Sequence, residues 1–171
     1  VTIDHCVAFR NGYVYDEYGQ ITKAGAGNGF KLGGSGISGH HVLKNSFAYD
    51  NKGNGIDSNT CPDVEIYHNI AFNNQFSNIA LYTCNKADTA FIAAGNISYR
   101  YGQEGEGDFL HLKGQDEHTI YTEDNFFYDE TKKVSRNCKG DEVTADMFIS
   151  LDTSILPRRK PDGSLDLQGL L

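Results

Sequence analysis

Few residues in this sequence have the type and neighbours of a catalytic side chain. Lys31 differs from the other lysines in the residues that flank it. It lies between the apolar residues Phe30 and Leu32, inside the glycine-rich stretch GNGFKLGGSGISGHH (27–41). A solvated surface lysine needs neither two large apolar neighbours nor so much flexible backbone. Lys31 is therefore a candidate functional cation, and the alternative is an ordinary surface lysine paired with Asp57.

The cysteines and histidines lack the spacing of common metal and redox motifs. The chain has four cysteines and no CxxC pair: Cys6, Cys61, Cys84 and Cys138. This pattern argues against a zinc ribbon or a thioredoxin-like site and leaves open free thiols or one or two disulfides. Four histidines stand alone on expected turns, without HxH or HExxH spacing, and are typical of polar surface: His40, His41, His68 and His111. A metal site formed by proximity, with His5 and Cys6, remains an alternative.

Internal repetition predicts the elements that hold these residues. Five segments each contain an alternating apolar stretch, an aromatic residue and a polar turn: VTIDHCVAFRNG (1–12), HVLKNSFAYDNKG (41–53), VEIYHNIAFNNQ (64–75), FIAAGNISYRYG (91–102) and TIYTEDNFFYDE (119–130). Their aromatic residues are 40, 23, 27 and 29 positions apart. Short strands at such a period, with Gly/Asn turns and no helix, predict an all-β fold, the right-handed parallel β-helix. A sandwich or barrel is the alternative, because turn spacing alone does not exclude it.

Two columns of residues recur in these repeats. Asn11, Asn51 and Asn74 fall at the same turn, and stacked amides there would hydrogen-bond from coil to coil as a structural ladder. The aromatic residues are expected to stack inside the solenoid, with a sugar-binding row as the alternative: Phe9, Tyr49, Phe72, Tyr99 and Tyr128.

A second, shorter strand follows most repeats and fixes the direction of Lys31. These strands are GFKLGG (29–34), GIDSN (55–59), NIALYT (78–83) and FLHLKG (109–114). Alternation predicts four outward residues, Lys31, Asp57, Ala80 and His111, and four inward ones that precede them, Phe30, Ile56, Ile79 and Leu110. Lys31 is thus expected on the outer face of a flat sheet, one rung from Asp57. Its glycines would keep that face open for a polymer.

Charge and hydropathy narrow the range of partners. The net charge is −8 over 171 residues, which argues against nucleic acid or anionic lipid as a partner. No apolar run approaches the ~20 residues that span a membrane. The chain opens in a strand pattern without an initiator Met, so we expect its start, with any targeting signal, to have been removed.

The lysine-bearing segment resembles a known family. GNGFKLGG, followed by ISGHHVLKNSFAYDNKGNGIDSN, is similar to the corresponding segment of polysaccharide lyase family 9, and VTIDHCVAFRNG and FISLDTSILPRRKPDGSL resemble its coil and C-terminal segments. Members are parallel β-helix enzymes that cleave pectate-type polyuronates by β-elimination. The resemblance implies that Lys31 is the Brønsted base, that Ca²⁺ neutralises the substrate carboxylate, and that the protein is secreted.

The implied mechanism sets further expectations. A lysine ordinarily has a pKa of ~10.4, so a lysine base implies an alkaline pH optimum. The family's calcium aspartates precede the coil that opens this chain, and before Lys31 only Asp4 and Asp16 are present. We therefore expect no metal ligands here and a solenoid that is incomplete at its N-terminus.

The other predicted site residues are those that could bind the carboxylates of an acidic polysaccharide. We predict substrate binding by Asp57, Lys44 and Arg10, with Arg100 and Lys113 as further cations. Hydrolysis is disfavoured because only Asp57 points outward, and a hydrolase needs two carboxylates. The alternative function is a non-catalytic β-helical glycan-binding or adhesion module. We expect a monomer with coils over residues 1–130 and an irregular tail over 131–171 that packs on the solenoid.

Overall fold

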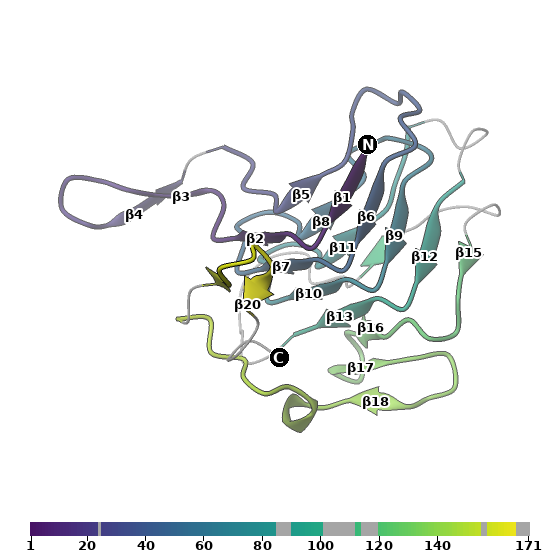
Figure 1. The fold of residues 1–171 in the computed structure, drawn as a ribbon. Helices are drawn as coiled ribbons and strands as arrows, with labels where there is room; N and C mark the ends of the chain where they lie inside the picture. Colours follow the sequence, from purple (N-terminus) through teal and green to yellow (C-terminus); the bar gives the residue numbers. More distant parts are fainter. Residues whose placement is uncertain (24, 85–89, 101–111, 114–119, 155–156, 167–171) are drawn as a thin grey trace.

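Three parallel β-sheets wind around one axis in the computed structural model (Figure 1). The structure describes residues 1–23, 25–84, 90–100, 112–113, 120–154 and 157–166. Each of the first four coils contributes one short strand to each sheet, and the strand pairs within these three sheets are parallel. This arrangement confirms the predicted parallel β-helix. Among the described residues, no helix has the length and apolarity that a membrane crossing requires.

The strands are two or three residues long, and each sheet stacks them from coil to coil. The first sheet contains β1 (Thr2–Asp4), β6 (Val42–Lys44), β9 (Glu65–Tyr67), β12 (Ile92–Ala94) and β15 (Ile120–Tyr121). The second sheet contains β2 (Val7–Phe9), β7 (Phe47–Tyr49), β10 (Ile70–Phe72) and β13 (Ile97–Tyr99). The third sheet, which carries Lys31, contains β5 (Phe30–Lys31), β8 (Ile56–Asp57), β11 (Ile79–Ala80) and β14 (Leu112–Lys113).

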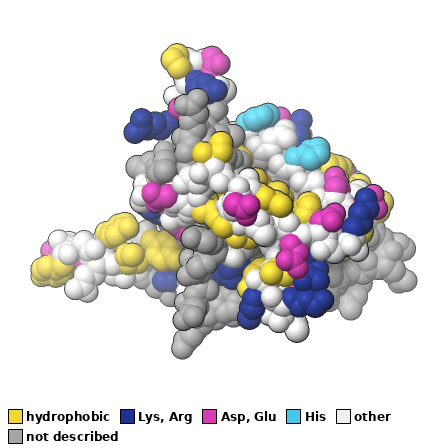
Figure 2. Space-filling view, turned by 90° about the horizontal axis from the view of Figure 1, so that it is seen from below, with side chains coloured by type: hydrophobic (Ala, Val, Ile, Leu, Met, Phe, Trp, Pro, Cys, Tyr) yellow, Lys and Arg dark blue, Asp and Glu magenta, His cyan; other side chains and the backbone are white. Residues whose placement is uncertain are grey.

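Antiparallel elements flank the solenoid. A hairpin of β3 (Tyr13–Tyr15) and β4 (Ile21–Lys23) projects from the first coil, and hydrophobic side chains lie along this arm in Figure 2. The hairpin accounts for the first, longest interval between repeats. The C-terminal elements are β16 (Phe127–Asp129), β17 (Val134–Arg136), β18 (Glu142–Val143), a 3₁₀ turn (Ala145–Met147), β19 (Arg158–Arg159) and β20 (Leu165–Asp166).

The strand register agrees with the predicted repeats except at one rung. Phe9, Tyr49, Phe72 and Tyr99 are successive partners in the second sheet, as the alignment of repeats predicted. In the third sheet, however, Ile79 and Ala80 pair with Leu112 and Lys113. The prediction had Leu110 and His111 there, and both lie outside the described residues. Alternation repeats every two residues, so a shift by two keeps every face and leaves no signal in the sequence.

Tight turns between the sheets depend on single residues in the left-handed conformation. Between the first and second sheets these residues are His5, Asn45, His68 and Gly95, with φ of 51°, 49°, 51° and 63°. After the second sheet they are Arg10, Asp50 and Asn73, with φ of 51°, 50° and 50°. Asn and Asp tolerate this conformation best, and His5, His68 and Arg10 adopt it here as well.

Ladders of asparagine side chains provide hydrogen bonds to the buried turns. The Asn11 amide donates to Asn51 at 2.9 Å, and the Asn51 amide donates to Asn74 at 2.8 Å, which confirms the predicted ladder. A second ladder, not anticipated, joins Asn69, Asn96 and Asn125 through bonds of 3.0 Å at the turn between the first two sheets. Amides can donate and accept at once, so one side chain serves two coils.

The core is divided into two clusters by the second sheet. Ala48 and Ala71 face the solenoid interior with Leu43, Ile56 and Ile79. The aromatic column packs on the opposite face of the same sheet, against three residues of the C-terminal segment, Val143, Phe148 and Leu151.

The aromatic residues were predicted to stack inside the solenoid, and this prediction was wrong about which face of the second sheet they occupy. The rings do stack, with centroid distances of 5.4 Å for Phe9–Tyr49 and 4.9 Å for Tyr49–Phe72. Small residues fit the narrow interior, and the C-terminal segment covers the rings. Tyr128 belongs instead to the antiparallel strand β16.

Candidate active site

Lys31 lies on the outer face of the third sheet, with its flanking residues in the core. β5 and β8 pair Lys31 directly with Asp57, as predicted. Leu32 is buried and Phe30 packs against the interior cluster, whereas Lys31 is exposed. Within the described part of the chain, Lys31 forms no hydrogen bond or ion pair. The alternative of a lysine paired with Asp57 is therefore not observed.

The glycines beside Lys31 have a structural reason that differs from the predicted one. A Cβ on Gly29 would collide with the carbonyl oxygen of Gly55 in the next coil. Gly33 has a φ of 109°, and a Cβ there would lie 2.5 Å from the Cβ of Cys61. These glycines let adjacent coils approach closely, so the open outer face is not their main consequence.

Asp57 is buried although it belongs to the outer face, with 2% of its surface exposed. Its Oδ2 atom accepts hydrogen bonds from the side-chain amides of Asn28 at 2.5 Å and Asn54 at 3.2 Å. Its Oδ1 atom accepts one from the backbone amide of Asn59 at 2.7 Å. The Tyr82 hydroxyl also hydrogen-bonds to the carboxylate. These donors compensate the burial of the charge.

Tyr82 is kept neutral beside this carboxylate. Burial, followed by the negative charge of Asp57 and the hydrogen bond to it, raises the pKa of Tyr82 to about 12. The phenol therefore remains a hydrogen-bond donor at mildly alkaline pH, where a lysine base would operate.

The loop that follows Lys31 is fastened by Asp63. This carboxylate accepts hydrogen bonds from the Ser38 hydroxyl and from the backbone amides of Gly39 at 3.0 Å and His40 at 3.2 Å. The His40 Nδ1 atom lies 2.9 Å from Asp63 Oδ2. Asp63 thus fastens residues 38–40, the end of the loop that follows the lysine.

Two of the predicted substrate-binding residues lie elsewhere. Lys44 is on the first sheet, and its Nζ atom is 3.2 Å from Asp4 Oδ2 in a surface ion pair. Arg10 follows the second sheet, and its guanidinium donates to the Thr153 carbonyl oxygen at 2.5 Å, which ties the C-terminal segment to the solenoid. Of the predicted set, only Asp57 accompanies Lys31.

The other predicted cations have separate positions. Arg100 donates to the carbonyl oxygens of Asn74 at 2.8 Å and Phe76 at 3.1 Å, so it supports the turn that precedes β11. Lys113 occupies the register position beside Ala80 in the third sheet.

Sequence reasoning missed three residues that surround Asp57. Asn28 and Asn54 each stand three positions before an outward residue, in the repeated pattern Asn28-Gly-Phe-Lys31 and Asn54-Gly-Ile-Asp57. This repetition could have identified them as a pair. Tyr82 carried no such signal, because its contact with Asp57 arises only when the third coil stacks on the second.

The thiols and acidic residues form no metal centre in the described residues. All four cysteines are free: Cys61 is buried, Cys6 is half-buried, and Cys84 and Cys138 are exposed. The described residues contain no group of three or more His, Cys, Asp or Glu that could hold an ion. Asp57 already accepts four donors, so these residues by themselves do not fit a calcium site.

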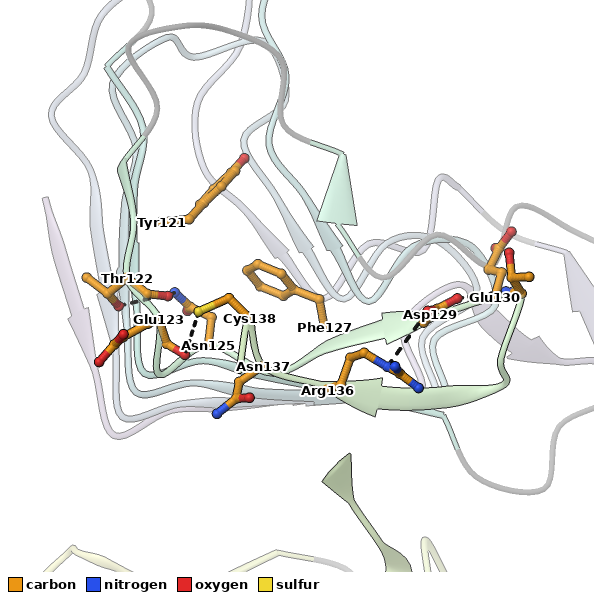
Figure 3. A pocket seen from close by; sticks show the side chains of 11 residues that line it. Tyr121, Thr122, Glu123, Asn125, Phe127, Asp129, Glu130, Arg136, Asn137 and Cys138 are labelled. Atoms are coloured by element: carbon orange, nitrogen blue, oxygen red, sulfur yellow. Dashed lines mark hydrogen bonds and ion pairs between the residues drawn. The ribbon is translucent and has the colours of Figure 1, made fainter. Parts of the chain in front are cut away.

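A cavity of about 590 Å³ (Figure 3) is lined by residues between Tyr121 and Cys138, whereas Lys31 belongs to β5 of the first coil. Tyr121 and Phe127 line it with their rings 5.7 Å apart, edge to face. Its cation Arg136 is engaged by Asp129 at 3.8 Å and Glu142 at 3.1 Å. None of the predicted site residues lines this cavity.

Comparison with known proteins identifies the family. A family model described as the Pel9A-like right-handed β-helix region matches residues 1–96. A protein named pectate lyase L from Paenibacillus polymyxa (strain SC2) is 36% identical over 173 residues, which covers 100% of this chain and 34% of that protein. A protein of the same name from Thermoclostridium stercorarium is 36% identical over 149 residues, covering 87% of this chain and 11% of that protein.

A solved structure agrees with these relatives. The crystal structure of pectate lyase Pel9A matches with a TM-score of 0.67 and 26% identity, covering 96% of this chain and 36% of that one. The chain thus spans about a third or less of the length of these relatives. The family match extends over more than half of the chain and confirms the resemblance found in the sequence. This chain therefore belongs to the Pel9A-like right-handed parallel β-helix family.

Proposed function

We propose that the chain forms the lysine-bearing part of a secreted, monomeric polysaccharide lyase that cleaves a pectate-type acidic polymer by β-elimination. The position of Lys31 carries this proposal: an exposed cation, unpaired among the described residues, on the outer face of a parallel sheet. The relatives named pectate lyase support the substrate class.

In the proposed reaction, the neutral amine of Lys31 takes the proton from C5 of a uronate unit. The electron pair of the C5–H bond forms a C4–C5 double bond, the C4–O bond breaks, and the departing oxygen takes a proton from water. Lysines ordinarily ionise near pH ~10.4, so the neutral fraction rises with pH.

Asp57 acts as a positioning residue in this proposal. Its oxygens accept from Asn28, Asn54 and Asn59, and the neighbouring Tyr82 phenol stays protonated. A glycoside hydrolase would need a second carboxylate a few ångströms away. Among the described residues of the third sheet, Asp57 is the only carboxylate on this face. Calcium remains a proposal from the family relationship alone.

The experiment follows the ultraviolet absorbance of unsaturated uronate ends while the chain, extended upstream by the coils expected to carry the calcium aspartates, acts on polygalacturonate with Ca²⁺ at mildly alkaline pH. We expect Lys31→Ala to lower the rate by roughly 10²- to 10⁴-fold, the usual contribution of a general base. Lys132→Ala, at an exposed lysine of the β16–β17 turn, is the matched control and should leave the rate unchanged. Equal rates in Lys31→Ala and the wild type would refute the lysine base. Binding without any unsaturated product would favour the glycan-binding module.

A further inference from the structure

A second lysine, Lys52, is held in place near Lys31 without a carboxylate partner. Its ammonium lies 5.6 Å from the centre of the Tyr13 ring, at the base of the projecting hairpin. Its Cβ is packed so closely by Gly12 and Gly27 that a side chain on either glycine would come within about 3 Å of it. Both glycines have positive φ, 83° and 70°. The Cβ of Lys52 therefore packs against the first coil.

The charge of Lys52 is uncompensated within the described part of the chain. No described carboxylate lies within ion-pair distance of its ammonium. Asp50, two positions away, instead hydrogen-bonds to Thr153 and interacts with Arg10. In a protein of net charge −8, a positioned cation without a partner offers a site for an external anion.

Lys52 lines a cavity of about 370 Å³, which we call the Lys52 cavity. Its wall includes Asn28 and Asn54, the two residues whose amides bind the Asp57 carboxylate. Each side-chain amide carries two N–H donors, and the bond to Asp57 uses one of them. The volume falls within the usual range of small-molecule sites, roughly 300–1,000 Å³.

An aromatic ring completes the wall of the Lys52 cavity. Phe76 is 44% exposed, so its ring is accessible at the wall of the cavity. Arg100 donates to the Phe76 carbonyl oxygen at 3.1 Å, so the turn that carries the ring is supported from the next coil. A cation, two amides and an exposed ring together suit a sugar that carries a carboxylate, because the ring offers an apolar face to its C–H side.

The Lys52 cavity adjoins Lys31 through Asp57. Asn28 precedes Lys31 by three positions, roughly 10 Å of extended chain. Asn54 precedes Asp57 by the same number, and Asp57 is the strand partner of Lys31. A polymer lying across the outer face could therefore reach both lysines at once.

We propose that the Lys52 cavity is a uronate subsite, in which the Lys52 ammonium binds a sugar carboxylate and Phe76 covers one face of the ring. This inference rests on the proposed function, because the acidic polymer assigned to Lys31 is its ligand. The subsite makes Lys52 a specificity residue. A uronate unit whose carboxylate is esterified carries no negative charge and loses the contact with the Lys52 ammonium.

The test measures binding of trigalacturonate by calorimetry in the Lys31→Ala chain, so that the ligand is not consumed. Adding Lys52→Gln, which retains most of the stem but removes the charge, should weaken binding about tenfold through loss of a charge-assisted hydrogen bond. Lys132→Gln is the matched control and should bind like the parent. Lys52→Arg retains the charge and should recover most of the affinity.

The methyl ester of trigalacturonate gives a second comparison. The parent should prefer the free acid, and Lys52→Gln should remove that preference. Phe76→Ala should weaken both ligands alike. Equal affinity for the acid in the parent and in Lys52→Gln, or an unchanged preference over the ester, would overturn the proposal, as would no binding by the parent.

Failure of the subsite and failure of the lyase proposal give different results. If the wild-type chain forms unsaturated product while Lys52→Gln changes neither binding nor KM, the subsite is wrong and the lyase stands. If binding depends on Lys52 but the protein extended upstream through the expected calcium coils forms no product with Lys31 present, the subsite stands as a glycan-binding site and the lyase proposal is wrong.

Discussion

The hydrogen bonds around Asp57 predict that the isosteric change Asp57→Asn is damaging. A carboxylate accepts at both oxygens, whereas an asparagine replaces one of them with a donor. If that donor faced the position of Oδ1, it would meet the backbone N–H of Asn59, which cannot rotate away. If it faced the position of Oδ2, it would meet the amides of Asn28 and Asn54.

The side-chain amides of Asn28 and Asn54 cannot rotate by half a turn to compensate, because each would lose another hydrogen bond. The carbonyl oxygen of the Asn28 side chain accepts the backbone N–H of Asn54 at 3.0 Å, and that of Asn54 accepts the backbone N–H of Ser77 at 3.0 Å. Either orientation of the substituted amide therefore breaks one or two hydrogen bonds to a former charge, worth about 1.5–3 kcal/mol each. We expect the free energy of unfolding to fall by about 2–4 kcal/mol.

Urea unfolding followed by circular dichroism measures this loss. Glu17→Gln is the matched control, because it removes one negative charge at an exposed position of the hairpin and should change stability by less than about 0.5 kcal/mol. A loss in Asp57→Asn no greater than in this control would refute the view that the carboxylate is required by its donors.

Three further predictions concern pH. Burial is the main cause that raises the pKa of Tyr82 and Tyr49 to about 12. The folded state therefore holds these protons more tightly than the unfolded state, so the free energy of unfolding should fall as pH rises from 10 toward 12. Tyr→Phe changes should reduce this pH dependence of stability, measured by urea titration. Burial acts to raise the pKa of Asp63, but hydrogen bonds from the 33–40 loop outweigh it and lower the pKa. The Gly39 amide should therefore be protected from hydrogen exchange above pH 3.8, the ordinary pKa of an aspartate, and should lose this protection as pH falls below that value. If Lys31 is the base, the cleavage rate should rise from about pH 7 toward ~10, and a maximum near pH ~5 would exclude it.

Much of the fold could be predicted because its signals are local. The repeat and the alternation of side chains identified the coils, the first asparagine ladder and the outward direction of Lys31. The second ladder had an equally local signal that was missed, since Asn69, Asn96 and Asn125 each stand three positions before the aromatic residue of their repeat.

The errors have physical reasons of their own. Alternation shows which residues share a face but not which face meets the axis, so Tyr49 and Phe72 were placed inside. A two-residue shift preserves alternation, so Leu110 and His111 were predicted at the register positions that Leu112 and Lys113 occupy. The role of Arg10 in substrate binding stays a prediction, but no local pattern revealed that its guanidinium donates to the Thr153 carbonyl oxygen.

The sequence by itself determined that Lys31 stands on an outer face beside Asp57, because a period of two and a repeat of coils suffice for that. Only the tertiary structure decided what surrounds the pair. Asp57 is buried by Asn28 from the coil before it and Tyr82 from the coil after it, so its contacts cross between coils. The same stacking packs Lys52 against glycines of the first coil. Contacts between residues 20 to 40 positions apart exist only once the solenoid has closed, and these contacts shape the candidate site.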